Sequence, residues 1–180
     1  MEQKITLTRV TDSTSSDYIF TEELLTTAFP PDEYRPLPAQ RHNATHEPTF
    51  HLMIARSSNH PVGFISYWLL NGICYVEHLA TTPAQRGRGY GSAILNELQK
   101  RVGATVLEVE TPTDDISRRR IEFYKRQGFE LCSIPYTQPP YCESGNSIPM
   151  FLMFRGATPT NKLFDKTKKE IYSKIYSHQE

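Results

Sequence analysis

The part of this sequence best suited to chemistry is a glycine-rich loop that contains two arginines. Gln85–Ser92 reads QRGRGYGS and stands between an apolar stretch and a helix-like pattern. Glycine at every second position lets successive backbone N–H groups point into one concavity, and such a concavity at a helix N-terminus binds anions. Arg86 and Arg88 add positive charge at its rim, and the hydroxyl of Ser92 adds a donor. The loop is therefore predicted to hold a pyrophosphate group.

Three interpretations of the loop compete. It could be a basic, glycine-rich turn that binds no ligand. It could be a Rossmann dinucleotide site with Glu110 at the end of the next strand, but the spacing is GxGxG rather than GxGxxG, and Pro83 separates the strand from the glycines. A P-loop is excluded because no Gly-Lys-Ser/Thr follows. The third interpretation is a coenzyme A site.

The coenzyme A interpretation is supported by a specific resemblance. Gln85–Gly91, preceded by Leu79–Pro83, resembles the acetyl-CoA signature Q/R-x-x-G-x-G/A of the GNAT superfamily of N-acetyltransferases, with Arg86, Gly89 and Gly91 at its defining positions. A second match is Phe123–Phe129, FYKRQGF, which resembles the family's helix ending in a tyrosine and Gly-Phe. The order of the expected elements, from the first strand to about Arg155, also agrees with the family.

The resemblance implies how the coenzyme is held. The strand Tyr75–Thr81 is expected to bulge and splay from Thr105–Val109, which opens a V-shaped slot where pantetheine adds to the strand edge. Ser117 stands where relatives often have an asparagine, and Arg120 stands where a small residue is usual. The cofactor acetyl-CoA is expected without a metal, and its predicted contacts are Leu79, Ala80, Thr81, Arg86, Gly87, Arg88, Gly89, Tyr90, Gly91, Ser92, Ser117 and Tyr124.

N-acylation also needs a base, because an alkylammonium with a pKa of ~10.4 is not nucleophilic. In an extended strand Glu77 shares a face with Thr81, so Glu77 is the first candidate, acting directly or through a water. Glu108 and Glu110, on one face of the neighbouring strand, are its rivals. His78 is interpreted as a packed, hydrogen-bonded residue. A solvated or salt-bridged carboxylate on the sheet surface, without a catalytic role, is the simpler alternative for Glu77.

The resemblance also assigns a proton donor and an acceptor side. Tyr124 is expected near the coenzyme sulfur, where its phenol can protonate the leaving thiolate; a core tyrosine is the alternative. In this family the acceptor side is built from the loop after the first helix and from the loop before the last strand, here residues 29–46 and 135–149. Cys142 lacks a paired His–Asp and is not expected to act as a nucleophile.

The sequence therefore predicts an N-acetyltransferase that transfers an acetyl group from acetyl-CoA to a primary amine in a ternary complex. The acceptor would be a small-molecule or a peptide amine. The alternative is a catalytically weak or inactive acyl-CoA-binding module for regulation or interaction. In that case the Lys-rich terminal helix could dock on a partner.

The elements that must position these residues follow from periodicity and turn signals. Asp17 is expected to cap the first helix, residues 31–48 to form a long loop or a weak helix near residues 38–42, and Asn71-Gly72 to form a hairpin turn. The class is α+β, with a mixed, mostly antiparallel sheet, one parallel pair and flanking helices. Expected strands are 5–10, 49–55, 62–70, 73–81, 105–109, 129–134 and 150–155, and expected helices begin at 17, 89, 114 and 161. Residues 1–155 are predicted to form the domain, and residues 156–180 a Lys-rich C-terminal helix.

Composition limits the possible partners. The chain has 180 residues with 20 basic and 20 acidic side chains, so its net charge is zero and a nucleic acid or an anionic membrane is not expected as an obligate partner. No secretory signal or membrane-spanning stretch is evident, and three cysteines without CxxC spacing are typical of free thiols. We therefore expect a cytoplasmic protein; the sequence leaves monomer and homodimer open.

Overall fold

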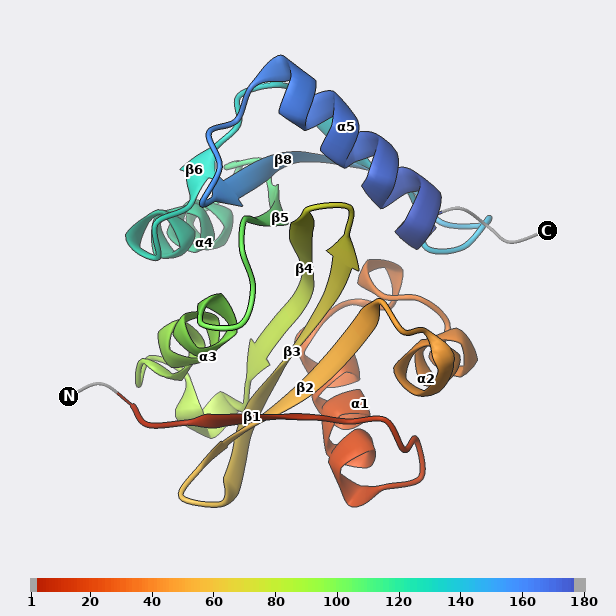
Figure 1. Ribbon diagram of the computed structural model, residues 1–180, viewed down its shortest axis with the longest axis vertical. Coiled ribbons are helices and arrows are strands. Elements are labelled where there is room, and N and C mark those ends of the chain that lie inside the picture. The colour runs from red at the N-terminus through yellow and green to blue at the C-terminus, as the bar shows by residue number, and fades with distance from the viewer. Residues whose placement is uncertain (1–2, 177–180) are drawn as a thin grey trace. The chain divides into compact units, whose positions relative to one another are not determined.

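The computed structural model describes residues 3–176, which form a mixed sheet with helices on its faces (Figure 1). The strand order is β1-β2-β3-β4-β5-β8-β6, and β7 pairs with β8. The contacts within the chain define two compact units. Unit 1 comprises Met1–Leu69 and Val76–Val102, and unit 2 comprises Leu70–Tyr75 and Gly103–Glu180.

Unit 1 is built on four strands, β1 (Thr6–Arg9), β2 (Phe50–Ser57), β3 (His60–Leu70) and β4 (Ile73–Thr81). β1 and β2 are antiparallel, as are β2 and β3, where Phe50 lies opposite Trp68 and Ile54 opposite Phe64. The residue pairs Phe50–Trp68 and Ile54–Phe64 both consist of large, buried apolar side chains. These strands agree with the predicted ones within a few residues, and the Asn71-Gly72 turn joins β3 to β4 as expected, with Gly72 at φ 89°.

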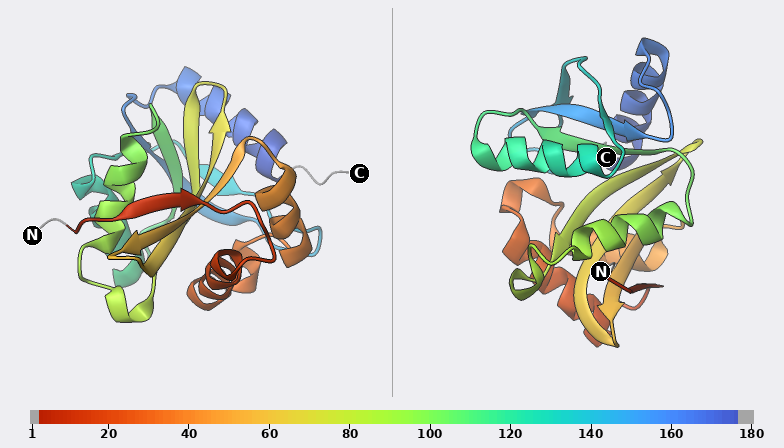
Figure 2. Two further views of the ribbon diagram at one scale, coloured as in Figure 1. Left: turned by 60° about the horizontal axis from the view of Figure 1, so that its bottom comes forward. Right: turned by 90° about the vertical axis from the view of Figure 1, so that its left-hand side faces the viewer.

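Three helices cover the sheet of unit 1: α1 (Ser16–Ala28), α2 (Leu37–His46) and α3 (Tyr90–Gln99). Figure 2 shows α3 on one face of β1–β4 and α1 and α2 on the other. The predicted cap Asp17 is wrong by two residues, because the Ser15 side chain accepts from the Tyr18 N–H at 3.1 Å. Asp17 instead lies in the first turn and pairs with Arg56. The weak helix expected near residues 38–42 is the full helix α2.

Unit 2 has an antiparallel core of β5 (Thr105–Glu110) and β8 (Ile148–Arg155), flanked by the short strands β6 (Glu130–Leu131) and β7 (Tyr136–Gln138). Its helices α4 (Asp115–Arg126) and α5 (Asn161–Ile171) lie on opposite sides of β8 (Figures 1 and 2). The parallel pair β4–β5 begins inside this unit, where the Cys74 N–H donates to the Ala104 carbonyl at 2.8 Å. The predicted α+β class with one parallel pair is confirmed.

The sequence pattern was least accurate between α4 and β8. The expected strand over 129–134 is reduced to Glu130–Leu131, and the expected loop contains β7. A strand of two or three residues carries almost no alternation, and only its pairing partner β8 reveals it. Of the segment 156–180 that was predicted to form the terminal helix, Asn161–Ile171 is α-helical and Tyr172–Tyr176 is a π-helical turn, while residues 177–180 lie outside the described residues.

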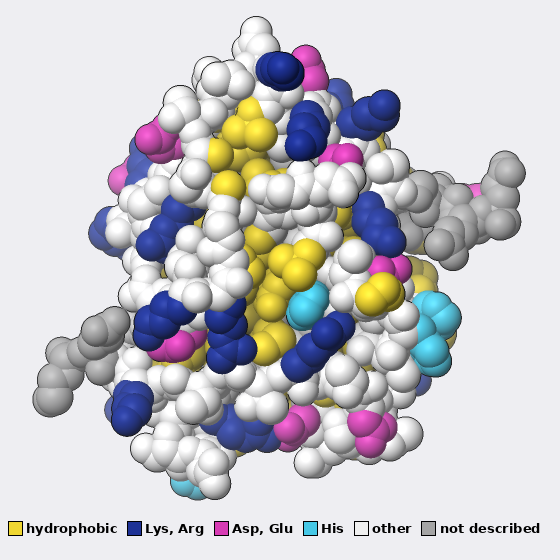
Figure 3. Space-filling view, viewed as in Figure 1, with side chains coloured by type: hydrophobic (Ala, Val, Ile, Leu, Met, Phe, Trp, Pro, Cys, Tyr) yellow, Lys and Arg dark blue, Asp and Glu magenta, His cyan; other side chains and the backbone are white. Residues whose placement is uncertain are grey.

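Each unit has its own apolar core. Unit 1 buries Phe50, Ile54, Phe64, Ile94 and Leu95, and unit 2 buries Leu107, Leu152, Phe154, Phe164 and Ile171. On the face in Figure 3, Lys and Arg side chains, with Asp and Glu scattered among them, surround exposed hydrophobic side chains. Within residues 3–176, no helix combines the length and apolarity that a bilayer crossing requires.

Candidate active site

The N-terminus of α3 is an open cradle for an anion. Gly87 and Gly89 have φ of 73° and 84°, a conformation that favours glycine, and Gly89 is the N-cap. A Cβ at Gly87 would meet nothing within 4 Å, and one at Gly89 only the Gln3 side chain at 3.9 Å. The N–H groups in the first turn of any helix lack intrahelical acceptors. Here no side chain of the described residues caps them either. This geometry fits a pyrophosphate group.

The sequence before α3 explains why the loop is shaped this way. Pro83–Gln85 forms a 3₁₀ turn, and the N–H of Arg88 donates to the Gln85 carbonyl at 3.4 Å. The Arg88 side chain also donates to Gln85 Oε1 at 3.0 Å. Arg86 and Arg88 are both exposed. Two exposed positive charges at a helix N-terminus add to the attraction for an anion there.

The end of β4, where coenzyme contacts are predicted for Leu79, Ala80 and Thr81, is held closely on its β3 side. A Cβ at Gly63 would overlap the Ala80 carbonyl oxygen and lie 3.1 Å from Thr81 Cα. The Thr82 N–H also donates to the Val62 carbonyl at 3.0 Å. The absence of a side chain at Gly63 therefore permits this close approach of the two backbones.

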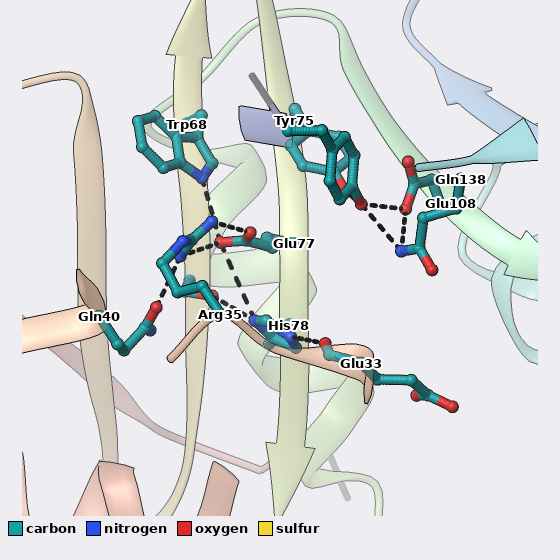
Figure 4. A network of polar contacts seen from close by, with 11 residues as sticks. Glu33, Arg35, Gln40, Trp68, Tyr75, Glu77, His78, Glu108 and Gln138 are labelled. Atoms are coloured by element: carbon teal, nitrogen blue, oxygen red, sulfur yellow. Dashed lines mark hydrogen bonds and ion pairs between the residues drawn. The ribbon is translucent and has the colours of Figure 1, made fainter. Parts of the chain in front are cut away.

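Glu77, the first candidate base, is neutralised inside unit 1. Its side chain is 0% exposed and forms a two-pronged ion pair with Arg35, which comes from the segment between α1 and α2 (Figure 4). Trp68 Nε1 donates to Glu77 Oε2 at 3.0 Å. Burial alone would raise the pKa of Glu77, but Arg35 and the hydrogen bonds hold that pKa below its usual value. A carboxylate with a lowered pKa and a bound guanidinium is a poor proton acceptor.

Arg35 is itself enclosed by the same residues of unit 1. Its guanidinium donates to Gln40 Oε1 at 2.6 Å and lies 5.6 Å from the Phe50 ring centre and 5.4 Å from that of Trp68. The neighbouring His78 is buried, with Nε2 2.8 Å from the Glu33 carbonyl and Nδ1 3.3 Å from Ser66 Oγ. Desolvation lowers the pKa of His78, which agrees with its interpretation as a packed residue.

Glu108 in unit 2 has a different environment. Its carboxylate accepts hydrogen bonds from the hydroxyl of Tyr136, from Gln138 Nε2 at 2.6 Å and from the Tyr176 hydroxyl at 2.8 Å. Within the described residues it has no cationic partner. Burial raises the pKa of Glu108, and the hydrogen bonds from Tyr136, Tyr176, Tyr75 and Gln138 offset only part of that increase. Glu108 is therefore a carboxylate poised to accept a proton.

The other predicted acid, Glu110, is exposed and paired with Arg120 at 2.8 Å, which accounts for both residues without a ligand. Glu77, Glu108 and Glu110 thus differ in their charge balance: two are paired with arginines and one is not. Sequence periodicity could not distinguish these three glutamates. It indicates the face of the strand on which a side chain lies, but not the side chain with which it pairs.

Tyr124 lies on α4 with its ring at 5.2 Å from Phe123 and 5.6 Å from Phe129. Within the described residues its hydroxyl has no hydrogen-bond partner. The hydroxyl oxygen is also not fully enclosed by protein. Desolvation raises the pKa of Tyr124, so the phenol keeps its proton at neutral pH. A protonated phenol with a free hydroxyl is suited to donating a proton or a hydrogen bond.

Ser117 has a structural role that the sequence did not predict. It forms a capping box with Asp114: the Ser117 N–H donates to Asp114 Oδ1 at 2.7 Å, and the Asp114 N–H donates to Ser117 Oγ at 3.2 Å. This arrangement makes Asp114 the cap of α4, the helix expected to begin near residue 114, and occupies the Ser117 hydroxyl. Its contact with a cofactor stays a prediction.

The open mixed sheet with one parallel pair, and the glycine loop that opens a helix after β4, agree with the acetyltransferase fold that the resemblance implied. The family model described as "Acetyltransferase (GNAT) family" matches residues 18–129. The chain belongs to this acetyltransferase family, and the predicted enzyme class is confirmed.

Solved structures agree with this assignment. A protein from Bacteroides thetaiotaomicron assigned to the GNAT family is similar at 38% identity, with a TM-score of 0.92 and coverage of 97% of this chain and 99% of that one. An aminoglycoside 6'-N-acetyltransferase in complex with coenzyme A shares 16% identity at a TM-score of 0.60, covering 86% and 98% of the two chains. A GNAT acetyltransferase from Elizabethkingia anophelis with acetyl-CoA bound shares 17% at 0.57, covering 84% and 97%. The last two show the fold alone, and no curated protein matches the sequence.

Proposed function

We propose that the protein is an N-acetyltransferase that transfers an acetyl group from acetyl-CoA to a primary amine by direct attack in a ternary complex. The observation that carries the proposal is the uncapped, glycine-lined N-terminus of α3 in a chain of the acetyltransferase family. Relatives of the same fold include proteins solved with coenzyme A and with acetyl-CoA.

In this proposal unit 1 holds the coenzyme. The backbone N–H groups at Gly87–Ser92 bind the pyrophosphate, and Arg86 and Arg88 neutralise part of its charge. The backbone of Leu79–Thr81 binds the pantetheine by strand addition, and one of its N–H groups stabilises the oxyanion, an interaction typically worth about 3–4 kcal/mol. Bound acetyl-CoA supplies the acetyl thioester.

Unit 2 supplies the proton-transfer groups. The amine nitrogen forms a bond to the acetyl carbon as the carbon–sulfur bond breaks. Glu108 takes the proton that the amine must lose, and Tyr124 gives a proton or a hydrogen bond to the departing sulfur. Glu108 replaces Glu77 as the proposed base, because Glu77 is neutralised by Arg35 whereas Glu108 has no cationic partner among the described residues.

The acceptor is proposed to enter beside residues 29–46 and 135–149. The first segment carries Arg35 and the second carries β7, so each is fixed to a strand of its own unit. Tyr136 and Gln138 from the second segment already contact Glu108. The three cysteines, Cys74, Cys132 and Cys142, are free thiols, which supports the further proposal that the protein works in the cytoplasm.

Calorimetric titration with acetyl-CoA tests the proposal, with NAD as a parallel control. Saturable binding of acetyl-CoA alone is expected, followed by thiol release when amines are added. Binding without thiol release from any amine would favour the acyl-CoA-binding module, and binding of NAD alone would favour the dinucleotide site.

Gly89→Glu is expected to abolish coenzyme binding in the same titration. The side chain would fill the cradle with like charge and would impose a strained positive φ at residue 89. Gly103→Glu is a matched control, because a Cβ there meets nothing within 4 Å and its φ is not positive. Retained affinity in Gly89→Glu would mean that the pyrophosphate is bound elsewhere.

Tyr124→Phe is expected to lower kcat by about 10²- to 10⁴-fold, the range typical for loss of a general acid, and to change coenzyme affinity by no more than a few-fold. Thiol release at saturating acetyl-CoA measures kcat, and the titration measures affinity. Unchanged turnover would remove the proposed role of the phenol.

A further inference from the structure

The far end of the described chain meets the Glu108 carboxylate. Tyr176 is 4% exposed, and its hydroxyl donates to Glu108 Oε2 at 2.8 Å. The same hydroxyl accepts from Gln138 Nε2 at 2.8 Å and lies 3.3 Å from the Tyr75 hydroxyl. Gln138 Nε2 also donates to Glu108 Oε2 at 2.6 Å. The Tyr176 hydroxyl, Gln138 Nε2 and Glu108 Oε2 are therefore joined in a closed triangle of hydrogen bonds.

Several contacts keep Tyr176 in this place. Helix α5 is capped by Thr160, whose side chain accepts from the Leu163 N–H at 3.2 Å, and it buries Phe164 and Ile171 in the core of unit 2. The Tyr176 ring packs at 4.9 Å from Tyr141. The packing of α5 and of the Tyr176 ring thus holds the hydroxyl at Glu108. The Tyr172 hydroxyl of the same turn donates to the Thr137 carbonyl on β7 instead.

The groups that face Glu108 are neutral at neutral pH. Tyr75 comes from β4, Tyr136 and Gln138 from β7, and Tyr176 from the π-helical turn. Tyr141 and Tyr172 pack against this set. Since every direct partner donates a hydrogen bond, the partners both orient the carboxylate and favour its ionised form.

We propose that Tyr176 is a positioning residue for Glu108, so that the C-terminal segment Asn161–Tyr176 completes the proton-accepting centre of unit 2 instead of serving as an appended helix. The proposal rests on the proposed role of Glu108 as the base. The Lys-rich exposed side of α5 plays no part in it. What matters is the single hydroxyl that the segment delivers.

Tyr176→Phe removes this hydroxyl and retains the ring. The ionised form of Glu108 then loses a donor, so the pKa of Glu108 rises and a smaller fraction is ionised at any pH near it. The acid limb of the kcat/KM profile should move to higher pH by about one unit, with a plateau at high pH close to that of the wild type. Tyr172→Phe is the matched control: it removes a hydroxyl of the same segment that bonds a carbonyl, and its acid limb should not move.

A superimposable profile for Tyr176→Phe, with Glu108→Gln inactive, would overturn the positioning role while Glu108 stands as the base. An unchanged profile for Glu108→Gln would overturn both. A second readout needs no turnover: the ¹³C carboxyl resonance of Glu108, followed against pH in the protein without coenzyme. Its midpoint should move upward in Tyr176→Phe and not in Tyr172→Phe, and equal midpoints in all three proteins would contradict the proposal.

Discussion

Arg35→Met is expected to lower the free energy of unfolding by about 3–5 kcal/mol, because it leaves the Glu77 carboxylate buried without a counter-charge. The Glu77 side chain is 0% exposed and that of Arg35 only 6%, so water cannot replace the guanidinium. Methionine keeps much of the apolar contact that Arg35 makes with Phe50 and Trp68, which isolates the effect of charge. Urea denaturation of wild type and variant measures the difference.

The chain offers a matched control in Arg41, which pairs with Glu22 through a side chain that is 49% exposed. Arg41→Met should cost less than about 1 kcal/mol, since exposed pairs contribute little. Adding Glu77→Gln to Arg35→Met should recover part of the lost stability, because the unpaired charge is then removed. If Arg35→Met and Arg41→Met lowered the free energy of unfolding by similar small amounts, the stabilising role of the buried Arg35–Glu77 ion pair would be contradicted.

The same pair gives stability a pH dependence with a definite sign. The pKa of Glu77 is lowered in the folded protein, so the ionised carboxylate stabilises the fold above the pKa of an unfolded glutamate. That contribution is lost as pH falls through the folded pKa of Glu77. Glu108, whose pKa is raised, has the opposite effect, and its ionisation as pH rises costs stability.

Glu108→Gln is expected to lower kcat by about 10²- to 10⁴-fold, the range typical for loss of a general base, while leaving affinity for acetyl-CoA within a few-fold. Glutamine has nearly the same shape and can still accept from Tyr136, so the fold should survive. Thiol release at saturating coenzyme and amine measures kcat. The loss should be smaller at high pH, where more of the amine is already deprotonated.

Glu110→Gln is the control on the same strand, since Glu110 is exposed and pairs with Arg120. It should leave kcat within a few-fold of the wild type. Equal losses in both variants would point to a general effect of negative charge, and a fully active Glu108→Gln would exclude Glu108 as the base and return the search to a water chain.

The features that could be predicted from the sequence are local ones. The glycine loop, the Asn71-Gly72 turn and the end of α4 at Gly128 each depend on a few neighbouring residues, and Gly72, Gly89 and Gly128 all have the positive φ that such positions require. The order of the elements along the chain, derived from periodicity and turn signals, agreed with the family resemblance. The ion-pair partner of Glu77 could not be predicted, because Arg35 lies 42 residues away in a stretch without periodicity.

The same limit applies to Glu108. Its donor Tyr176 is 68 residues away, beyond the part of the chain that the resemblance covered. Gln138 and Tyr136 were placed by the sequence only within the acceptor-side loop 135–149, since the strand that aligns them is three residues long. A carboxylate's chemistry is decided by its neighbours in space, and those neighbours come from segments that no local pattern connects.

The contact between Trp68 and Glu77 gives the protein a built-in optical probe. The chain has a single tryptophan, and its indole donates to Glu77 beside the Arg35 guanidinium, entirely within unit 1. Tryptophan emission during unfolding therefore follows unit 1, whereas the tyrosines around Glu108 belong to unit 2 and leave that signal unchanged. Comparing emission with far-ultraviolet circular dichroism thus separates cooperative unfolding of the whole chain from unit-by-unit unfolding, by whether the two transitions coincide.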